Sequence, residues 1–445
     1  MPKYFGTDGV RGIAGKFISA TLAYRIGRYI GQYPNGHKNK ILIARDTRIS
    51  GKLLANSVGT GAVASGSDVY DIGVSTTPSV SYLVRKHHFD FGVMISASHN
   101  PYYDNGIKVF NSQGEKLEAS IEELIEGYID SPEDNLPMMD YEHIGEYPDD
   151  AEQLVNEYIS YLVSKASPLV AKLKVLVDCS NGSASKIAPR LLDELGCTVT
   201  ITNASPDGIN INKDCGSTHI ENLSKMASEG NYDVAFAFDG DADRCLAMTN
   251  EGKVVDGDAI MYMCAKSMRA HRELNDDTVV ITVMSNLGLK KAFEAEGIKI
   301  HETTVGDKYV QADMKANNLS LGGEQSGHII FLEDMNTGDG LLTMIKVMNI
   351  LVKEKKSIQE LVKPLVIYPQ CLKNVKVKDK KAILSDEGFN KRIKELEDGL
   401  NGYGRILVRA SGTEPLIRVM CEAKTEKDCE EICNTLVEYI NKIQG

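Results

Sequence analysis

The sequence predicts an α/β protein made of several domains. Short apolar segments alternate with longer segments of helical periodicity, which is the pattern of a doubly wound α/β fold. Several of the apolar segments end in a polar stretch that contains glycine, serine or aspartate. At 445 residues the chain is too long for one hydrophobic core and should divide into roughly three or four domains.

The composition excludes several classes of protein. No run approaches the roughly 18 apolar residues that cross a bilayer, and residues 1–12 lack the features of a signal peptide. We therefore expect a cytoplasmic protein without membrane insertion. The net charge of −12 argues against a nucleic-acid-binding surface, which needs clustered lysines and arginines. Nine cysteines without paired zinc spacing fit a reducing compartment, and Cys429 and Cys433 are most simply helical neighbours.

The first domain is expected at residues 1–150. Near its start, three glycines accompany Arg11, whose planar donor group could reach a ligand, although an unstructured N-terminus is the alternative. Strands are expected at 41–44, 69–73 and 92–95, and helices at 51–65 and after Pro78. Asp46 and Arg48 form the polar exit of the first strand. Residues 59–64 match a dinucleotide fingerprint but lie within the helix pattern, so we interpret them as a packing face of small residues.

Residues 94–101 present a serine hydroxyl at a strand end. The apolar strand gives way to Ser96 and Ser98, and Pro101 prevents it from continuing. An imidazole, His99, lies next to the second serine. Taken alone, the stretch also fits a simple Ser-Asn turn. Lys108 follows in what resembles one arm of a hairpin, residues 105–110, where a surface lysine is the ordinary interpretation.

An acidic, proline-containing stretch ends the first domain, and the second is expected at 151–253. Its predicted elements are a helix at 151–164 and strands at 174–178, 197–201 and 234–238. The last strand ends in Asp239, Asp241 and Asp243, whose carboxylates repel one another unless a cation such as Mg²⁺ lies among them. The spacing is not that of an EF-hand, and an acidic surface turn is the alternative. Arg244 follows directly and suggests that the metal also meets an anion.

The remaining chain supplies two further loops. In a third domain, residues 254–367, a loop with Glu324, Ser326 and His328 could bind the hydroxyls or an amine of a polar ligand, or be a solvated turn. In a last domain, residues 368–445, two strands within 405–420 are joined by a loop that resembles a phosphate-binding site in composition. Its residues are Arg409, Ser411, Gly412, Thr413 and Arg418. It is no Walker loop, and a plain hairpin turn is the alternative.

Together these segments indicate phosphoryl transfer, in which catalysis is mainly positioning and charge neutralisation. A hydroxyl nucleophile, an acidic metal loop, a loop for a polyhydroxy ligand and a phosphate loop follow one another along the chain. A serine that carries the phosphoryl group would divide the reaction into two displacements.

The same four loops resemble, in order, the signature loops of the α-D-phosphohexomutase superfamily. They are residues 96–101, 239–244, 323–328 and 409–418. Within the superfamily, residues 5–12 and Gln325 resemble the bacterial phosphoglucosamine mutase family, because phosphomannomutase/phosphoglucomutases usually carry methionine in the sugar loop. The resemblance implies four domains around a central cleft, three of them doubly wound α/β domains and the last a smaller C-terminal α+β cap.

The resemblance also implies a role for each residue. Ser98, not Ser96, would carry the phosphate and would bind one Mg²⁺ together with Asp239, Asp241 and Asp243. Around the transferring group would lie Lys108, Arg244, His99, Arg11 and His328. Glu324 and Ser326 would bind sugar hydroxyls, and the other phosphate would be held by Arg409, Ser411, Gly412, Thr413 and Arg418. Lys308 stands where this family commonly has arginine, so we assign it no contact.

The reaction implied is the interconversion of glucosamine 6-phosphate and glucosamine 1-phosphate through a 1,6-bisphosphate, on the route to UDP-N-acetylglucosamine and the cell wall. Glucosamine or glucose 1,6-bisphosphate would be the activator, and a homodimer and a cyclic-dinucleotide synthase partner are further implications. The alternatives are a phosphomannomutase or phosphoglucomutase, a phosphatase with Asp239 as nucleophile, and a sugar-phosphate sensor. A sensor should lack the nucleophile or the metal ligands, and all are present.

Overall fold

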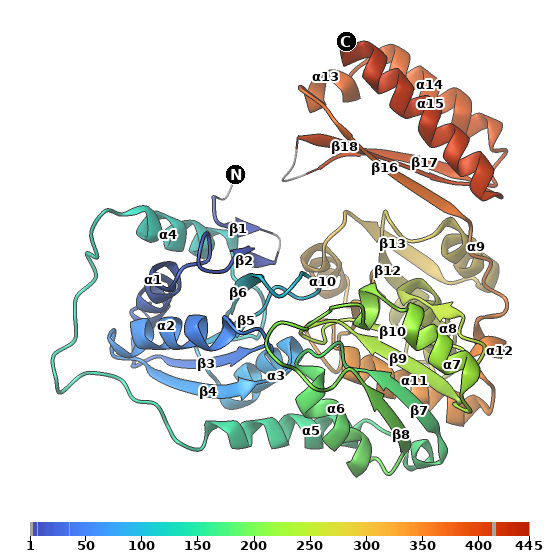
Figure 1. Ribbon diagram of the computed structural model, residues 1–445. Coiled ribbons are helices and arrows are strands. Elements are labelled where there is room, and N and C mark those ends of the chain that lie inside the picture. Colours follow the sequence, from blue (N-terminus) through green and yellow to red (C-terminus); the bar gives the residue numbers. More distant parts are fainter. Residues whose placement is uncertain (1–2, 7, 35, 412–414, 445) are drawn as a thin grey trace. The chain divides into compact units, whose positions relative to one another are not determined.

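The structure is a computed structural model that describes residues 3–6, 8–34, 36–411 and 415–444 (Figure 1). Its contacts divide the chain into two units. The first contains Met1–Met284 and Ile298–Val362, and the second contains Ser285–Gly297 and Lys363–Gly445. Every helix within the described ranges is too short or too polar to span a bilayer.

The first unit opens with a six-stranded sheet of order β1-β2-β6-β5-β3-β4. Its strands are β1 (Phe5–Gly6), β2 (Gly9–Ile13), β3 (Lys40–Arg45), β4 (Asp68–Val74), β5 (Phe91–Ile95) and β6 (Asp104–Phe110). Its helices are α1 (Ala20–Gly31), α2 (Gly51–Val63), α3 (Thr77–His87) and α4 (Ala119–Asp130). Every residue of β5 is buried, because this strand lies between β3 and β6 and helices α2 and α3 pack against it. The strands and helices expected here are confirmed to within a few residues.

The small residues of α2 pack against α1, as expected from the sequence. A Cβ atom added at Gly61 would lie 2.1 Å from the carbonyl oxygen of Tyr24, and one added at Gly27 would lie 1.9 Å from that of Val58. Only glycine permits two backbones to approach so closely. The apparent dinucleotide fingerprint is therefore a helix-packing face.

A second sheet has the order β11-β10-β9-β7-β8. Its strands are β7 (Lys174–Asp178), β8 (Thr198–Thr202), β9 (Val234–Phe238), β10 (Cys245–Met248) and β11 (Val254–Val255). The helices of this region are α5 (Leu154–Ser164), α6 (Ala184–Glu194) and α7 (Glu221–Glu229), with the short 3₁₀ helices η1 (Ala151–Gln153), η2 (Pro168–Lys172) and η3 (Gly216–Thr218). The predicted strands of this region are again confirmed.

A third sheet has the order β13-β12-β14-β15. Its strands are β12 (Thr278–Thr282), β13 (Lys299–Thr303), β14 (Leu321–Gly323) and β15 (Ile329–Phe331). The first unit adds α8 (Gly257–Ala270), η4 (Asn275–Asp277), α10 (Asp307–Ala316), α11 (Gly340–Glu354) and α12 (Ile358–Val362).

The three sheets repeat one plan. Each has three adjacent parallel strands, and the third of these in chain order pairs antiparallel with the strand that follows it. The connections at this place are β5–β6, β9–β10 and β14–β15. They carry Ser98, the three aspartates and the Glu324 loop respectively. Three of the four predicted functional loops thus occupy equivalent positions in three sheets.

The second unit is an antiparallel sheet of order β16-β18-β17, whose one face is covered by α14 and α15 (Figure 1). Its elements are α9 (Leu287–Glu296), β16 (Gln370–Lys376), α13 (Lys380–Leu384), α14 (Glu387–Gly399), β17 (Arg405–Ala410), β18 (Leu416–Glu422) and α15 (Glu426–Gln444). Cys429 and Cys433 are buried neighbours on α15, as predicted. The α/β class is confirmed, while the boundaries near residues 150, 253 and 367 and the central cleft remain predictions.

Candidate active site

Ser98 is held in an unusual backbone conformation between β5 and β6. Its φ of 51° lies in the left-handed region, which costs a residue with a Cβ roughly 1–2 kcal/mol. The residue is only 1% exposed. Its Oγ donates a hydrogen bond of 2.5 Å to Oδ2 of Asp239 and lies 3.3 Å from Nδ1 of His99. The surrounding structure therefore aims this hydroxyl at the acidic loop.

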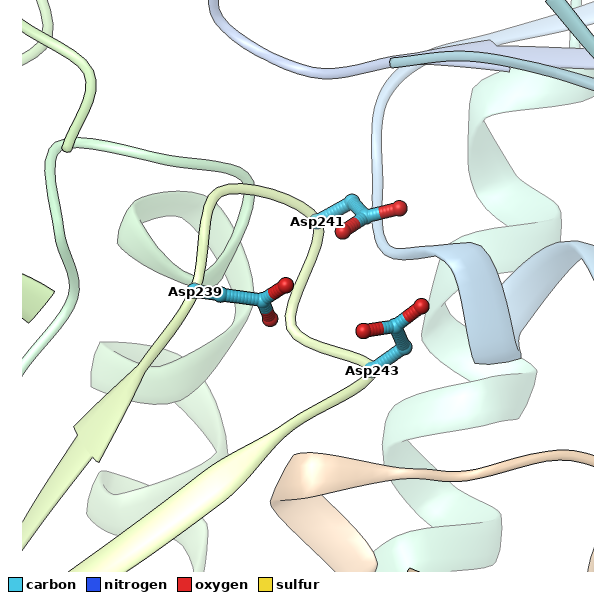
Figure 2. Close-up of side chains that lie close together, drawn as sticks. All are labelled: Asp239, Asp241 and Asp243. Atoms are coloured by element: carbon cyan, nitrogen blue, oxygen red, sulfur yellow. The ribbon is translucent and has the colours of Figure 1, made fainter. Parts of the chain in front are cut away.

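The carboxylates of Asp239, Asp241 and Asp243 point toward one another (Figure 2). One oxygen of each lies within 4.8 Å of the other two, and all three residues are buried. Burial, followed by the charges of Asp243 and Asp241, raises the pKa of Asp239 well above its usual value. Among the described residues, Oδ1 of Asp241 and Oδ1 of Asp243 find no hydrogen-bond partner. Converging buried oxygens of this kind fit a hard divalent metal ion.

Lys108, on β6, lies against the same cluster. Its Nζ is 2.8 Å from Oδ2 of Asp241, 3.4 Å from Oδ2 of Asp243 and 3.0 Å from Oδ2 of Asp8. Burial opposes its charge, but Asp241, Asp8 and Asp243 outweigh burial and raise the pKa of Lys108 well above its ordinary value. The lysine is therefore a fixed cation and not a surface group.

His99 and Arg244 form the other side of the Ser98 hydroxyl. Nη1 of Arg244 lies 3.3 Å from Nδ1 of His99, and the Arg244 backbone N–H donates to Oδ1 of Asp239 at 3.2 Å. Burial, then the charges of Arg244 and Arg11, lowers the pKa of His99 to about 4. The imidazole is consequently neutral at pH 7, so its Nδ1 can accept hydrogen bonds.

Arg11 enters the site through Asp8, a residue to which the sequence argument gave no role. Asp8 accepts from Arg11 and also pairs with Lys108 and, at 2.8 Å, with Lys116. Lys116 continues to Asp307 at 2.6 Å. Burial opposes ionisation of Asp8, but its cationic neighbours hold its pKa well below the usual range. The glycine-rich motif around Asp8 is the sequence feature that could have drawn attention to this residue. Its partners Lys108 and Lys116, however, are distant in sequence.

The β14–β15 loop is only partly in the cluster. His328 is buried, 3.8 Å from Oδ2 of Asp243, and the N–H of Gly338 donates to its Nε2 at 3.0 Å. This donation assigns the proton of a neutral ring to Nδ1, facing the aspartate. Oε1 of Glu324 accepts the N–H of Gly306 at 3.1 Å, whereas Ser326 is exposed.

Gln325, which pointed to the family within the superfamily, has a structural partner. Its Nε2 donates to Oδ2 of Asp256 at 3.1 Å, and Asp256 caps the N-terminus of α8. The backbone N–H of Gly257 returns a bond of 3.0 Å to the Gln325 carbonyl oxygen. This glutamine therefore ties the β14–β15 loop to the N-terminus of α8.

In the second unit, Arg409 and Arg418 lie directly opposite each other on β17 and β18. Burial and the charge of Arg418 lower the pKa of Arg409. Ser411 is buried, and its carbonyl oxygen accepts from Nζ of Lys380 at 2.7 Å. Gly412 and Thr413 lie outside the described residues. The two strands are confirmed, and the arginine pair offers positive charge for an anion.

Four regions of the chain match the domains of the phosphoglucomutase/phosphomannomutase family. Domain I, of α/β/α type, matches residues 2–135, domain II matches 156–252, domain III matches 256–367 and the C-terminal domain matches 372–438. The phosphoglucosamine mutase of Lachnoclostridium phytofermentans is 48% identical over 443 residues, 99% of each chain. The chain belongs to the phosphoglucosamine mutases, with all four domains of the phosphoglucomutase/phosphomannomutase family. The phosphoglucosamine mutase of Bacillus subtilis is 46% identical over the whole of both chains, 450 aligned residues. Membership in this family makes the chain an enzyme of the isomerase class.

Solved structures share the fold at lower identity. That of a phosphoglucomutase/phosphomannomutase family protein from Burkholderia thailandensis has a TM-score of 0.79 at 22% identity, covering 99% of this chain and 98% of that one. N-acetylphosphoglucosamine mutase from Aspergillus fumigatus, in complex with GlcNAc-6P and magnesium, has a TM-score of 0.72 at 19% identity, covering 100% and 96%. At these identities the likeness establishes the fold.

Proposed function

We propose that the chain interconverts glucosamine 6-phosphate and glucosamine 1-phosphate through a phosphorylated Ser98. The observation that carries the proposal is the Ser98 hydroxyl, buried 2.5 Å from Asp239 in a cluster fit for a metal ion. The full-length relatives named above are phosphoglucosamine mutases, which favours this reaction over that of a phosphomannomutase or phosphoglucomutase.

Two displacements complete the reaction. In the first, the phosphoryl group on Ser98 moves to the 1-hydroxyl of glucosamine 6-phosphate. The bond from phosphorus to O1 forms as the bond to Oγ breaks, and the proton lost by the sugar is matched by one gained at the serine. The resulting 1,6-bisphosphate then reverses its orientation in the site, so that its 6-phosphoryl group faces Ser98. Its 6-phosphoryl group then moves to Oγ of Ser98. The bond from phosphorus to Oγ forms as the bond to O6 breaks, and the proton lost by the serine is matched by one gained at O6, which leaves glucosamine 1-phosphate and the phosphorylated enzyme.

The charged residues of the cluster account for the transfer step. Lys108 at the aspartate cluster and Arg244 beside His99 supply fixed positive charge for the transferring oxygens, and Arg11 reaches the same network through Asp8. Neutral His99, 3.3 Å from Oγ of Ser98, accepts a hydrogen bond from Nη1 of Arg244. Asp239, Asp241 and Asp243, with an oxygen of the phosphorylated Ser98, would hold one Mg²⁺, which supplies charge neutralisation at the phosphoryl oxygens.

Substrate contacts are assigned by chemistry and by the resemblance of the loops. Glu324 and Ser326 would bind sugar hydroxyls, with His328 close to the reacting oxygen. The phosphate that is not being transferred would be held by Arg409, Ser411, Gly412, Thr413 and Arg418. Because either phosphate must be held in turn, this site requires charge and not a single rigid geometry.

The proposal also includes an activator, a location and partners, and these rest on the resemblance to the family. Glucosamine or glucose 1,6-bisphosphate is proposed as activator, because it can phosphorylate Ser98 again whenever the intermediate escapes. The Aspergillus fumigatus enzyme has been solved in complex with glucose 1,6-bisphosphate. A cytoplasmic location, a homodimer, a cyclic-dinucleotide synthase partner and the place on the route to UDP-N-acetylglucosamine remain predictions.

A substrate panel tests the proposed function. The purified chain is assayed with a bisphosphate activator and Mg²⁺ on the phosphates of glucosamine, glucose and mannose. We expect kcat/KM for glucosamine 6-phosphate to exceed that for the neutral sugars by about tenfold or more, the discrimination available to a site that pairs a substrate amine. Preference for mannose or glucose phosphate would instead support the alternative activity. In a chelation arm, activity should disappear and return with added Mg²⁺, and activity that survives rigorous chelation contradicts the metal role.

A further inference from the structure

Asp46 and Arg48 form a fully buried ion pair beside the Ser98 loop. They follow β3, whose C-terminal end lies next to that of β5 in the parallel sheet. Nε of Arg48 lies 2.8 Å from Oδ2 of Asp46, and both side chains have 0% exposure. Removing two charges from water is costly unless their remaining hydrogen-bonding groups are satisfied. The partners of this pair therefore indicate what it is for.

The guanidinium of Arg48 holds the backbone of the Ser98 loop. Nη2 donates to the carbonyl oxygens of Ser98 at 2.9 Å and Asn100 at 2.8 Å. Nη1 donates to those of Pro101 and, at 3.1 Å, Asp104. With Nε on Asp46, all five donors of the guanidinium are used. One side chain thus fixes four carbonyl groups of a single loop.

The same ion pair also reaches the amide of Ser98. Oδ2 of Asp46 accepts from Oγ of Ser96 at 2.7 Å, and Oγ of Ser96 in turn accepts the backbone N–H of Ser98 at 2.9 Å. Both sides of the nucleophile's backbone are consequently tied to Asp46 and Arg48. This closed set of bonds explains how a serine is kept at a φ of 51°.

Asn212, from the region of the second sheet, holds the same two carbonyl groups from another direction. Its Nδ2 donates to the carbonyl oxygens of Ser98 at 2.9 Å and Asn100 at 3.1 Å. The loop between β9 and β10 packs over this contact at Gly240. A Cβ added there would lie 2.5 Å from the carbonyl oxygen of Ser98 and 3.1 Å from Nδ2 of Asn212. The loop has no room to relax.

We propose that Arg48, fixed by Asp46 and assisted by Asn212, is a positioning residue that sets the direction of the Ser98 Oγ for both phosphoryl transfers. The proposal rests on the proposed function of Ser98. Arg48 is buried behind the loop and bonds only to its backbone and to Asp46 among the contacts given above, so it acts through the serine. Because both displacements use the same oxygen, a displaced loop slows each of them.

The test compares Arg48→Lys with Arg45→Lys, a matched control at the last residue of β3, three positions before Arg48. Arg45 pairs with Asp71 at 3.1 Å and holds no part of the Ser98 loop. Lysine keeps the charge at residue 48 but has only three donors and no planar fork. We expect kcat of Arg48→Lys to fall about 100-fold, the effect of a displacement near 1 Å at a reacting group. KM for glucosamine 6-phosphate should stay within about twofold, because sugar binding is untouched.

A second measurement separates positioning from general damage. Uptake of one phosphoryl group from glucose 1,6-bisphosphate onto Ser98 is followed by intact-protein mass spectrometry in a single turnover. This rate should fall by the same factor as kcat in Arg48→Lys and remain unchanged in Arg45→Lys, with both variants melting as folded proteins.

Several results would overturn the inference. One is an Arg48→Lys enzyme with unaltered kcat, and another is a loss that appears in KM instead. If residue 48 does not tolerate substitution, Asn212→Ala removes two bonds and keeps the ion pair. It should lower kcat about tenfold at constant KM, and an unchanged kcat contradicts the role. If the wild-type chain turns over without phosphorylating Ser98, the proposed mechanism fails and the inference falls with it.

Discussion

The Ser98 loop and the β17–β18 hairpin differ in which groups lie next to their cationic side chains. Beside Ser98, buried cations lie against carboxylates, as Arg48 does with Asp46 and Lys108 with Asp241. On β17 and β18, Arg409 and Arg418 are direct cross-strand partners, an arrangement that is unfavourable until an anion joins it. Paired charges hold a geometry, whereas opposed like charges attract a ligand. Under the proposed function, the first region would position the reacting serine and the second would hold a phosphate.

The largest effect should come from the nucleophile itself. Ser98→Ala removes the only atom of the loop that is proposed to form a bond to phosphorus, so kcat should fall by roughly 10⁶-fold. The melting temperature should change little, because the backbone bonds from Arg48 and Asn212 remain. Steady-state assays and intact mass measure both consequences. Mutase activity retained in the folded variant would remove the basis of the comparison.

The arginine pair should give a smaller effect, with opposite signs on binding and stability. Arg409→Gln removes charge-assisted bonds to phosphate worth about 1.5–3 kcal/mol, so KM should rise roughly 10- to 150-fold. Without ligand, relief of the repulsion from Arg418 should stabilise the free protein by about 0.5 kcal/mol. Steady-state kinetics and thermal melting of the free enzyme check the two signs.

Arg405→Gln, on the same strand, is the control for this prediction. Arg405 pairs with buried Glu422 at 2.6 Å, so its loss should lower the melting temperature and leave KM unchanged. If Arg409→Gln behaved like Arg405→Gln, the two strand arginines would have one structural role and the contrast between the regions would be lost.

The smallest effect concerns Arg28, a buried cation that is paired with a carboxylate and is not part of the candidate active site. Arg28 is fully buried and its Nε lies 2.9 Å from Oδ2 of Asp134, which is 31% exposed. The hydrogen bond from Arg28 lowers the pKa of Asp134 to about 2, against about 3.9 in an unfolded chain. The stabilisation is therefore present above pH 4 and is lost as the pH falls toward 2.

Asp134→Asn measures that contribution. At pH 7 the variant should melt about 2 °C below wild type, since the partly exposed pair is worth about 1 kcal/mol or less. The difference should shrink as the pH is lowered from 4 to 2, and kcat at pH 7 should not change. If the difference in melting temperature stayed constant across that range, or if kcat changed, Arg28 would not be a purely structural cation paired with a carboxylate.

The sequence predicts what is local. A buried strand that ends in polar residues can be recognised within ten positions, so β5, β9 and the loops after them were placed correctly. The repetition of one plan in three sheets was not foreseen, because it lies in topology and not in matching residues. The sequence shows Gln325 only as a residue typical of the family. Its hydrogen bond to Asp256 joins residues that are distant in sequence and can be seen only in the folded structure.

The residues that hold the site were missed for a physical reason. Asp8, Arg48 and Asn212 act by contacts across long sequence separations, as the 114 positions between Ser98 and Asn212 illustrate. An isolated aspartate or asparagine in a glycine-containing stretch predicts a turn as well as it predicts a buried partner. The untested roles of the individual site residues remain predictions that the variants above address.

The close contact at Gly240 also bears on how the protein is made. A ribosome delivers Arg48 and Ser98 early, but Asn212 and the glycine that closes over them emerge 114 or more positions after the serine. Until then the Ser98 turn is secured from one side only. The nascent chain therefore carries the proposed nucleophile long before the second sheet supplies the contacts that hold the Ser98 turn from its other side.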